Sequence, residues 1–158
     1  FSSQLDRVGK HITVVCTSVM VLEVRRASDF LNKFGIEVEI IDLHSISHPN
    51  QEMIYNSVSK TRLLLVADTS WLQYGVAAEI SRMILERNPK ILKKPAKSLG
   101  MQFAPCPTAK TLEDFYYPDV FEIVKTILSM MDEEFSNLTS LPVKQSMTDF
   151  YKHFKGPF

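Results

Sequence analysis

Two short apolar runs, separated by a stretch with helical spacing, open the chain and constrain its fold more than any other feature. Residues 11–18 are rich in β-branched side chains, and residues 37–43 alternate apolar and acidic side chains before Ile41. Short apolar runs on either side of a helical stretch indicate a strand–helix–strand unit on a parallel sheet. The sequence therefore predicts an α/β fold in which helices pack on a sheet.

The stretch between these runs has its apolar side chains on one face of a helix. They recur at intervals of three and four over residues 19–34: Met20, Val24, Ala27, Leu31 and Phe34. Ser18 is predicted to cap the start of this helix, because a serine hydroxyl accepts readily from a free amide of the first turn. Gly35 is predicted to end it in the left-handed conformation, which glycine adopts without strain.

Predicted strands and helices continue to alternate along the rest of the chain. Leucine-rich residues 62–67 predict a central strand buried on both faces, and residues 96–99 predict a shorter strand. Helices are expected over residues 50–59 with Asn50 as the cap, over 75–87, and over 119–131 with Pro118 in the first turn. Residues 102–108 predict an extended loop. Six side chains are predicted to lie in the sheet core: Ile12, Val14, Val38, Ile40, Leu64 and Val66.

Charge and composition exclude several classes of partner. The chain has 158 residues with 18 basic and 18 acidic side chains, so no long-range field favours nucleic acid or an anionic membrane. No segment approaches the roughly 18 consecutive apolar residues that a membrane span requires. With 45% apolar and 23% charged residues, the composition is that of an ordinary soluble globular domain.

No catalytic constellation can be assembled from the sequence. Neither a Ser-His-Asp nor a Cys-His arrangement follows from local spacing, and the four histidines give no metal-ligand pair. Cys16 is expected to be a small buried hydrophobe. His44 and His48 lie in one predicted turn, and histidines in surface turns are more often inert than catalytic. Asp68 follows the strongest strand, where ligands of open α/β sheets bind, although a capping or turn role is the commoner one.

Aromatic residues outside the predicted core indicate a contact surface. Trp71 and Tyr74 lie just ahead of a helix, and Phe103 lies in a loop. Aromatic side chains in such places concentrate at interfaces. The predicted interface residues are Trp71, Tyr74, Gly75, Glu79, Phe103, Pro105 and Pro107. The alternative is that Trp71 covers the core locally.

Six motifs occur in the order found in one enzyme family. They occupy residues 9–15, 34–50, 63–68, 71–80, 101–109 and 118–123. Over residues 8–131 the chain resembles the C-terminal domain of the β subunit of thiamine-diphosphate-dependent 2-oxoacid dehydrogenases of the pyruvate, branched-chain or acetoin type. It departs from the family pattern at His44, His48, Ala77 and the 102–109 loop, which indicates a divergent branch.

The resemblance implies a fold and a role. The fold is a three-layer α/β/α domain like the transketolase C-terminal domain, with a mostly parallel five-stranded sheet and one antiparallel strand. The role is non-catalytic assembly, with no catalytic, cofactor-binding or metal-binding residue in this domain. In such enzymes thiamine diphosphate and magnesium are held by the α subunit and by the preceding domain of the β subunit.

The resemblance also implies partners and a reaction. The whole enzyme decarboxylates a 2-oxoacid and transfers the acyl group to lipoamide. The implied partners are the α subunit, a second β subunit and the acyltransferase component. The implied location is the cytoplasm, or the mitochondrial matrix in a eukaryote.

Two other functions remain open. One is the C-terminal domain of another transketolase-like enzyme, such as transketolase, deoxyxylulose phosphate synthase or 2-oxoacid:ferredoxin oxidoreductase. The other is a stand-alone module that binds a small anion at the strand ends. The domain is predicted to span residues 8–131, with residues 132–158 as a partly ordered or partner-docking extension. Because the chain begins at Phe1 rather than Met, we expect a fragment of a longer protein.

Overall fold

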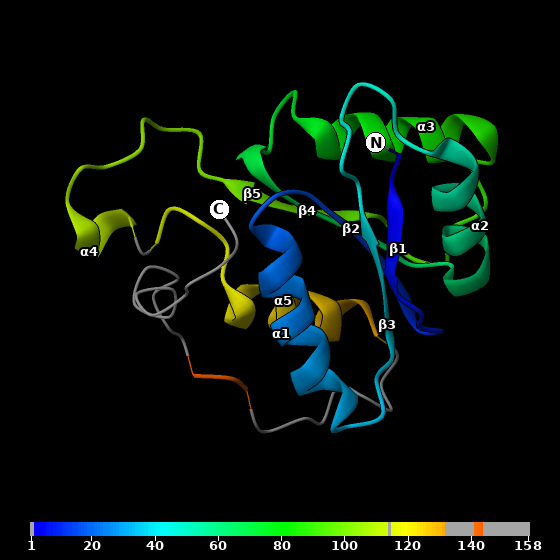
Figure 1. Ribbon diagram of the computed structural model, residues 1–158, viewed down its shortest axis with the longest axis horizontal. Coiled ribbons are helices and arrows are strands. Elements are labelled where there is room, and N and C mark those ends of the chain that lie inside the picture. Colours follow the sequence, from blue (N-terminus) through cyan, green and yellow to red (C-terminus); the bar gives the residue numbers. More distant parts are fainter. Residues whose placement is uncertain (1, 114, 132–140, 144–158) are drawn as a thin grey trace.

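A single mixed sheet organises the protein (Figure 1). The computed structural model describes residues 2–113, 115–131 and 141–143. In these residues the strands are β1 (Gln4–Arg7), β2 (Ile12–Cys16), β3 (Val38–Asp42), β4 (Leu64–Trp71) and β5 (Lys97–Met101). Their order in the sheet is β1-β3-β2-β4-β5. β1 runs antiparallel to β3 and the other pairs are parallel, which confirms the mostly parallel five-stranded sheet with one antiparallel strand.

Helices cover both faces of this sheet. α1 (Met20–Asn32) and α5 (Val120–Met130) lie on one face, and α2 (Gln51–Thr61) and α3 (Val76–Arg87) lie on the other (Figure 1). The short α4 (Lys110–Glu113) lies on the loop that extends beyond β5. The predicted three-layer α/β/α architecture is confirmed. No helix in the described part of the chain is long and apolar enough to cross a membrane.

The core divides between the two faces because successive strand residues point to opposite sides. Val14 and Leu65 face α1 and α5, whereas Val15, Leu64 and Val66 face α2 and α3. The predicted core residues are confirmed, since each is at most 1% exposed: Ile12, Val14, Val38, Ile40, Leu64 and Val66.

The ends of the helices confirm two sequence predictions and correct two others. Asn50 caps α2, with its Oδ1 accepting from the Met53 amide at 3.1 Å, and Gly35 has a φ of 79° after α1. Ser18 does not cap α1. Its own φ is 53°, the cap position is Val19, and the Val21 amide donates to the Ser18 carbonyl at 3.1 Å. Tight backbone bonds of this kind satisfy first-turn amides without a side-chain cap.

The start of α5 also differs from the prediction. Asp119 is the cap, with Oδ1 accepting from the Glu122 amide at 2.9 Å, so Pro118 precedes the helix rather than lying in its first turn. An aspartate is among the strongest capping residues, and it sets the boundary here.

Two strands differ from what local sequence indicated. β4 runs four residues beyond the predicted end at 67, and Trp71 pairs with Met101 of β5 after an irregularity in the register. β1 has no apolar alternation, and it precedes residue 8, where the domain is predicted to begin. Most of the predicted extension, residues 132–140 and 144–158, lies outside the described residues.

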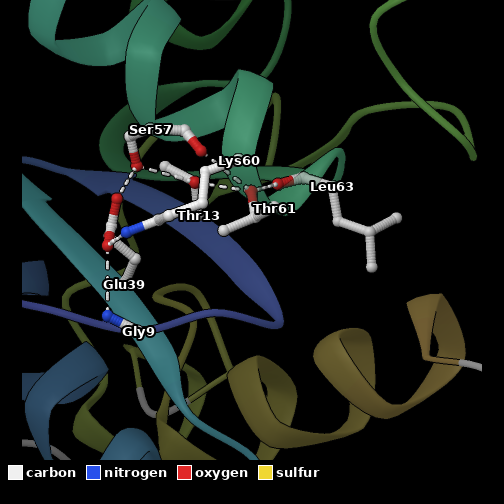
Figure 2. A network of polar contacts seen from close by, with 7 residues as sticks. All are labelled: Gly9, Thr13, Glu39, Ser57, Lys60, Thr61 and Leu63. Carbon is white, nitrogen blue, oxygen red and sulfur yellow. Dashed lines mark hydrogen bonds and ion pairs between the residues drawn. The ribbon is translucent and has the colours of Figure 1, made fainter.

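A buried polar network fixes α2 on the sheet (Figure 2). Glu39 of β3 is 2% exposed, and its carboxylate accepts from the Gly9 amide at 3.1 Å, from the Ser57 hydroxyl and from the Lys60 ammonium. Thr13 Oγ1 of β2 lies 2.8 Å from Ser57 Oγ. A buried carboxylate is costly unless it is paired and hydrogen-bonded, and a satisfied network selects one arrangement of its elements. α2 therefore has a defined position, which also fixes the loop that precedes it.

Candidate functional site

The loops that follow β2 and β3 meet the last residues of β4 and the start of α3 at one edge of the sheet, and together they enclose a crevice of about 340 Å³. The crevice opens here because β2 leads to α1 on one face, whereas β4 leads to α3 on the other. Ligands of open α/β sheets bind at such points. The lining residues are Thr17, Ser18, His44, Ile46, Asp68, Thr69, Ser70 and Val76.

Asp68 is the buried carboxylate of the crevice, with 4% exposure. Its Oδ1 accepts from the Thr17 hydroxyl at 2.5 Å and from the Thr69 amide at 2.7 Å, and its Oδ2 accepts from the Ser70 hydroxyl. These donors tie the end of β4 to the loop after β2. Asp68 therefore orders the loops, and both of its oxygens already have partners.

His44 enters the crevice from the loop after β3. Its Nε2 lies 3.0 Å from Asp42 Oδ2, and its amide donates to Asp42 Oδ1 at 3.2 Å. Its φ of 49° lies in the left-handed region. Ser18 and Tyr74, on the loops after β2 and β4, share this conformation, with φ values of 53° and 59°. Left-handed backbone is unusual for residues other than glycine, and it occurs often at functional loops.

The cysteines lie apart and differ in environment. Cys16 is fully buried in β2, and burial, with the nearby Asp42 carboxylate, raises the pKa of its thiol far above the usual range. Cys106 is exposed, with Sγ 3.8 Å from Tyr117 Oη, and this contact raises the pKa of the tyrosine. No three His, Cys, Asp or Glu side chains gather closely enough to hold a metal ion in the part of the chain that the structure describes.

The predicted interface residues lie beside the crevice, and the structure brings the main ones together. Trp71 is 46% exposed and Phe103 is 65% exposed, and their rings meet edge to face with centroids 4.9 Å apart. Tyr74 is 98% exposed. Pro105 is exposed and Pro107 is half-buried in the same loop. This loop is held by Tyr116, whose hydroxyl donates to the Ala104 carbonyl at 2.6 Å.

Gly75 and Glu79 have local structural roles. A Cβ on Gly75 would lie 2.2 Å from the Trp71 carbonyl oxygen and 2.6 Å from Ser70 Oγ, so this glycine is required by a close backbone approach within the chain. Glu79 lies exposed in the first turn of α3, and its hydrogen bond with Arg82 lowers the pKa of its carboxyl.

One surface residue was missed by sequence reasoning. Leu72 is 43% exposed, and Gly100 passes so close that its Cβ would lie 3.3 Å from Leu72 Cδ2. Its position depends on the pairing of β4 with β5, which the local sequence does not reveal. We call Trp71, Leu72, Tyr74 and Phe103 the aromatic surface.

Comparisons with known proteins agree with this architecture. The model of the family "Transketolase, C-terminal domain" matches residues 2–123. Among curated relatives, the mitochondrial pyruvate dehydrogenase E1 component subunit beta-2 of Oryza sativa subsp. japonica is 34% identical over 123 residues, which are 78% of this chain and 33% of that protein. The corresponding mitochondrial β subunit of Homo sapiens is 37% identical over 126 residues, or 79% of this chain and 35% of that protein. The chain thus spans about a third of the length of these relatives.

A solved structure shares the fold. It is described as a split gene transketolase in an inactive beta4 tetramer, and it superposes with a TM-score of 0.71 at 18% sequence identity. The match covers 81% of this chain and 40% of that one.

Proposed function

Because the chain belongs to the family of transketolase C-terminal domains, we propose that it is the non-catalytic assembly domain of a 2-oxoacid dehydrogenase β subunit. The parent enzyme would use thiamine diphosphate to decarboxylate a 2-oxoacid and would transfer the acyl group to lipoamide. The likeness to pyruvate dehydrogenase β subunits at 34–37% identity supports this substrate class. The structural observation that carries the assembly role is the aromatic surface, which exposes four large apolar side chains at one edge.

The described residues do not fit a magnesium–diphosphate group. Such a group needs carboxylate or amide oxygens around the ion. The buried carboxylate of the crevice, Asp68, already accepts from three donors, and Asp42 is engaged by His44. We therefore assign cofactor binding to the α subunit and to another part of the β subunit, and assign this chain the packing of subunits.

The proposed partners are the α subunit, a second β subunit and the acyltransferase component. The curated relatives named above are mitochondrial proteins, so the matrix is the proposed location in a eukaryote and the cytoplasm in a bacterium.

The decisive experiment extends the chain to its full reading frame and co-expresses it with the α subunit of the same organism. We expect a stable complex that decarboxylates pyruvate or a branched-chain 2-oxoacid when thiamine diphosphate and magnesium are supplied. A complex that instead transfers a ketol group between sugar phosphates would assign the chain to a transketolase. A start codon directly ahead of Phe1, with no binding to the α subunit, would contradict the assembly role.

The stand-alone anion-binding module is the second candidate, and the crevice favours it. His44 lines the crevice, and α3 begins beside it without a side-chain cap. A helix start without such a cap attracts anions. Titration with inorganic pyrophosphate, followed by the NMR signals of the His44 ring, separates the two candidates. Saturable shifts at micromolar concentration would favour the module.

A further inference from the structure

A second hollow lies beside the aromatic surface, between β5 and the start of α5, and we call it the β5–α5 groove. It has a volume of about 320 Å³, and its lining includes Leu72, Leu99, Phe115, Tyr117, Pro118 and Glu122. Phe115 is 68% exposed and Leu72 is 43% exposed. Binding pockets start at about this volume, and apolar walls around it suit single apolar side chains of a bound partner.

The groove has one acidic group. Among the described residues that line it, only Glu122 carries a charge, and this side chain is half-buried in the first turn of α5. A partner that places aromatic or aliphatic side chains in the groove therefore gains from a positive charge beside Glu122. The groove favours an occupant that is both aromatic and basic.

Residues 150–158 of this chain have that chemistry. Four of the nine side chains are aromatic, in a chain with 10% aromatic residues, and the two charged ones, Lys152 and Lys155, are basic. The segment lies outside the described residues and beyond residue 123, where the match to the family model ends. The fold of the shared domain therefore does not explain its composition.

The described part of the chain leaves this segment within reach of the groove. In Figure 1, α5 runs from left to right, and residues 141–143 lie at the lower left, level with the start of the helix. The fifteen residues 144–158 can span at most roughly 50 Å. A short tether gives an effective concentration on the order of 1 mM. A dissociation constant of about 0.1 mM between separate molecules would then favour the bound form about tenfold within one chain.

We propose that residues 150–158 bind in the β5–α5 groove of their own chain, with aromatic side chains against Leu72 and Phe115 and a lysine beside Glu122. The bound segment covers Leu72, which belongs to the aromatic surface. A subunit that packs on this surface first has to displace the segment, so the bound segment lowers the affinity of the chain for such a partner. This consequence rests on the proposed assembly role, whereas the contact between segment and groove does not.

A disulfide cross-link in the full chain tests where the segment lies. Cys106 Sγ is 3.8 Å from Tyr117 Oη, so a native thiol stands beside the groove. In a His153→Cys variant at low micromolar concentration, we expect mild oxidation to join the two cysteines within one chain. A cross-link that forms mainly between two chains overturns the inference.

The matched control removes the aromatic rings and keeps the tether. We call the chain with Phe150→Ser, Tyr151→Ser and Phe154→Ser the serine variant. When His153→Cys is added to it, the same two thiols are present, and their cross-link should form about tenfold more slowly because the segment no longer stays in the groove. Equal rates with and without the rings overturn the inference. Circular dichroism should show that each variant is folded.

A labelled peptide of residues 147–158 measures the same contact between separate molecules. By fluorescence anisotropy it should bind the serine variant with a dissociation constant of about 0.1 mM. Wild type should bind the peptide about tenfold more weakly, because its own segment occupies the groove. Equal binding to the two chains, or binding to neither, overturns the inference.

The charge of the groove gives a further test. Glu122→Gln, introduced into the serine variant, should weaken peptide binding about threefold, as expected for a partly exposed ion pair. Glu86→Gln is the control, since Glu86 is exposed on α3 at the opposite face of the sheet. It should leave peptide binding unchanged. Equal binding by the two substituted chains overturns the inference.

Binding to the α subunit separates this inference from the proposed function. A chain whose segment occupies the groove but that does not bind the α subunit contradicts the assembly role and leaves the inference standing. A chain that binds the α subunit, but whose cross-link and peptide binding do not depend on the aromatic rings, overturns the inference and leaves the assembly role standing.

Discussion

At the scale of single residues, surroundings decide behaviour more than residue type does. The two cysteines illustrate this, since Cys16 is fully buried between strands and Cys106 lies in an exposed loop. The thiolate is the reactive form of cysteine, and burial disfavours it.

Only one thiol should therefore react in the folded chain. Burial raises the pKa of Cys16, so its thiolate stays unpopulated at pH 8 and a reagent cannot reach it. Titration with a chromogenic disulfide should release about one equivalent natively and about two in denaturant. The control Cys106→Ser should release none until it is unfolded, and rapid native labelling of that variant would contradict the structure.

A second residue-scale prediction concerns Leu64, which is fully buried against α2 and α3. Leu64→Ala should lower the free energy of unfolding by about 2–5 kcal/mol, the usual cost of a cavity in a core. Leu85, which is 38% exposed on α3, gives the matched control, and Leu85→Ala should cost less than about 1 kcal/mol. Urea unfolding followed by circular dichroism measures both, and equal losses would refute the assigned burial.

Features of single residues could be predicted from the sequence where they depend only on residues nearby in the chain. Asn50 as a cap and Gly35 as a left-handed stop follow from local chemistry. Ser18 could not be placed, because the loop it belongs to is held by the bond between Thr17 and Asp68, fifty-one positions apart. The outward turn of Tyr74 likewise depends on how closely Gly75 meets the end of β4.

At the scale of elements, polar contacts between residues far apart in the sequence fix how a helix attaches to the sheet. The apolar pattern alone does not determine this attachment. α2 is attached through Ser57, whose hydroxyl donates to the buried Glu39 carboxylate (Figure 2). Apolar periodicity predicted the helix but not this attachment, since serine and threonine carry little pattern information in a helix.

Removal of the Ser57 hydroxyl should show how much this network contributes to the free energy of unfolding. Ser57→Ala leaves one oxygen of a buried carboxylate short of a donor, which should cost about 1–3 kcal/mol of unfolding free energy. Ser59 is on the same helix but is exposed, and it donates to the Tyr55 carbonyl. Ser59→Ala should change stability by less than about 0.5 kcal/mol. If denaturant titrations give the same midpoint for both variants, the network is not stabilising.

β1 was the least predictable strand, because its four residues show no alternation. It is placed by contacts with distant residues, among them the ion pair of Asp6 with Arg25 of α1, whose Nε donates to Asp6 Oδ2 at 2.8 Å. The hydrogen bond from Arg25 is the main cause that holds the pKa of Asp6 below its usual range.

This lowered pKa predicts a pH dependence. A carboxyl with a depressed folded-state pKa contributes stability above its unfolded pKa of about 3.9, and loses that contribution as pH falls through the folded value. The difference in unfolding free energy between wild type and Arg25→Gln should thus be constant above pH 5 and shrink below about pH 3.9. Lys10→Gln, which removes an exposed pair with Glu37, is the control and should show a smaller difference at each pH. A wild-type advantage that grows on acidification would contradict the ion pair.

At the scale of the whole molecule, the order of strands and helices was predictable and the site was only partly so. Three apolar runs with helical stretches between them are enough to specify parallel strands with covered faces. The crevice depends instead on which face each helix takes, and on loops whose backbone conformations arise from tertiary contacts. The aromatic surface was visible in the sequence as aromatic residues outside the core, whereas the place of Leu72 beside Gly100 of β5 is seen only in the structure.

The whole chain should bind neither thiamine diphosphate nor magnesium. Asp68 and Asp42 beside the crevice are engaged by neighbouring donors, and in the part of the chain that the structure describes no three His, Cys, Asp or Glu side chains gather closely enough for an ion. Calorimetric titration with the cofactor and magnesium together should give only heats of dilution. A full-length pyruvate dehydrogenase β subunit, assembled with its α subunit, is the positive control. A saturable isotherm with a micromolar dissociation constant for the chain alone would overturn the assignment.

The antiparallel direction of β1 has a consequence for how a longer chain would be tethered. Gln4 pairs with Asp42, and Ser3 Oγ donates to the Leu43 carbonyl at 3.2 Å, so β1 starts at the edge that holds the crevice and the aromatic surface. Any polypeptide that precedes β1 leaves from this edge, and a tether of ten residues reaches at most roughly 35 Å. A preceding domain would thus be present at high effective concentration beside the crevice and the aromatic surface. It would therefore bind these sites more readily than a separate molecule would.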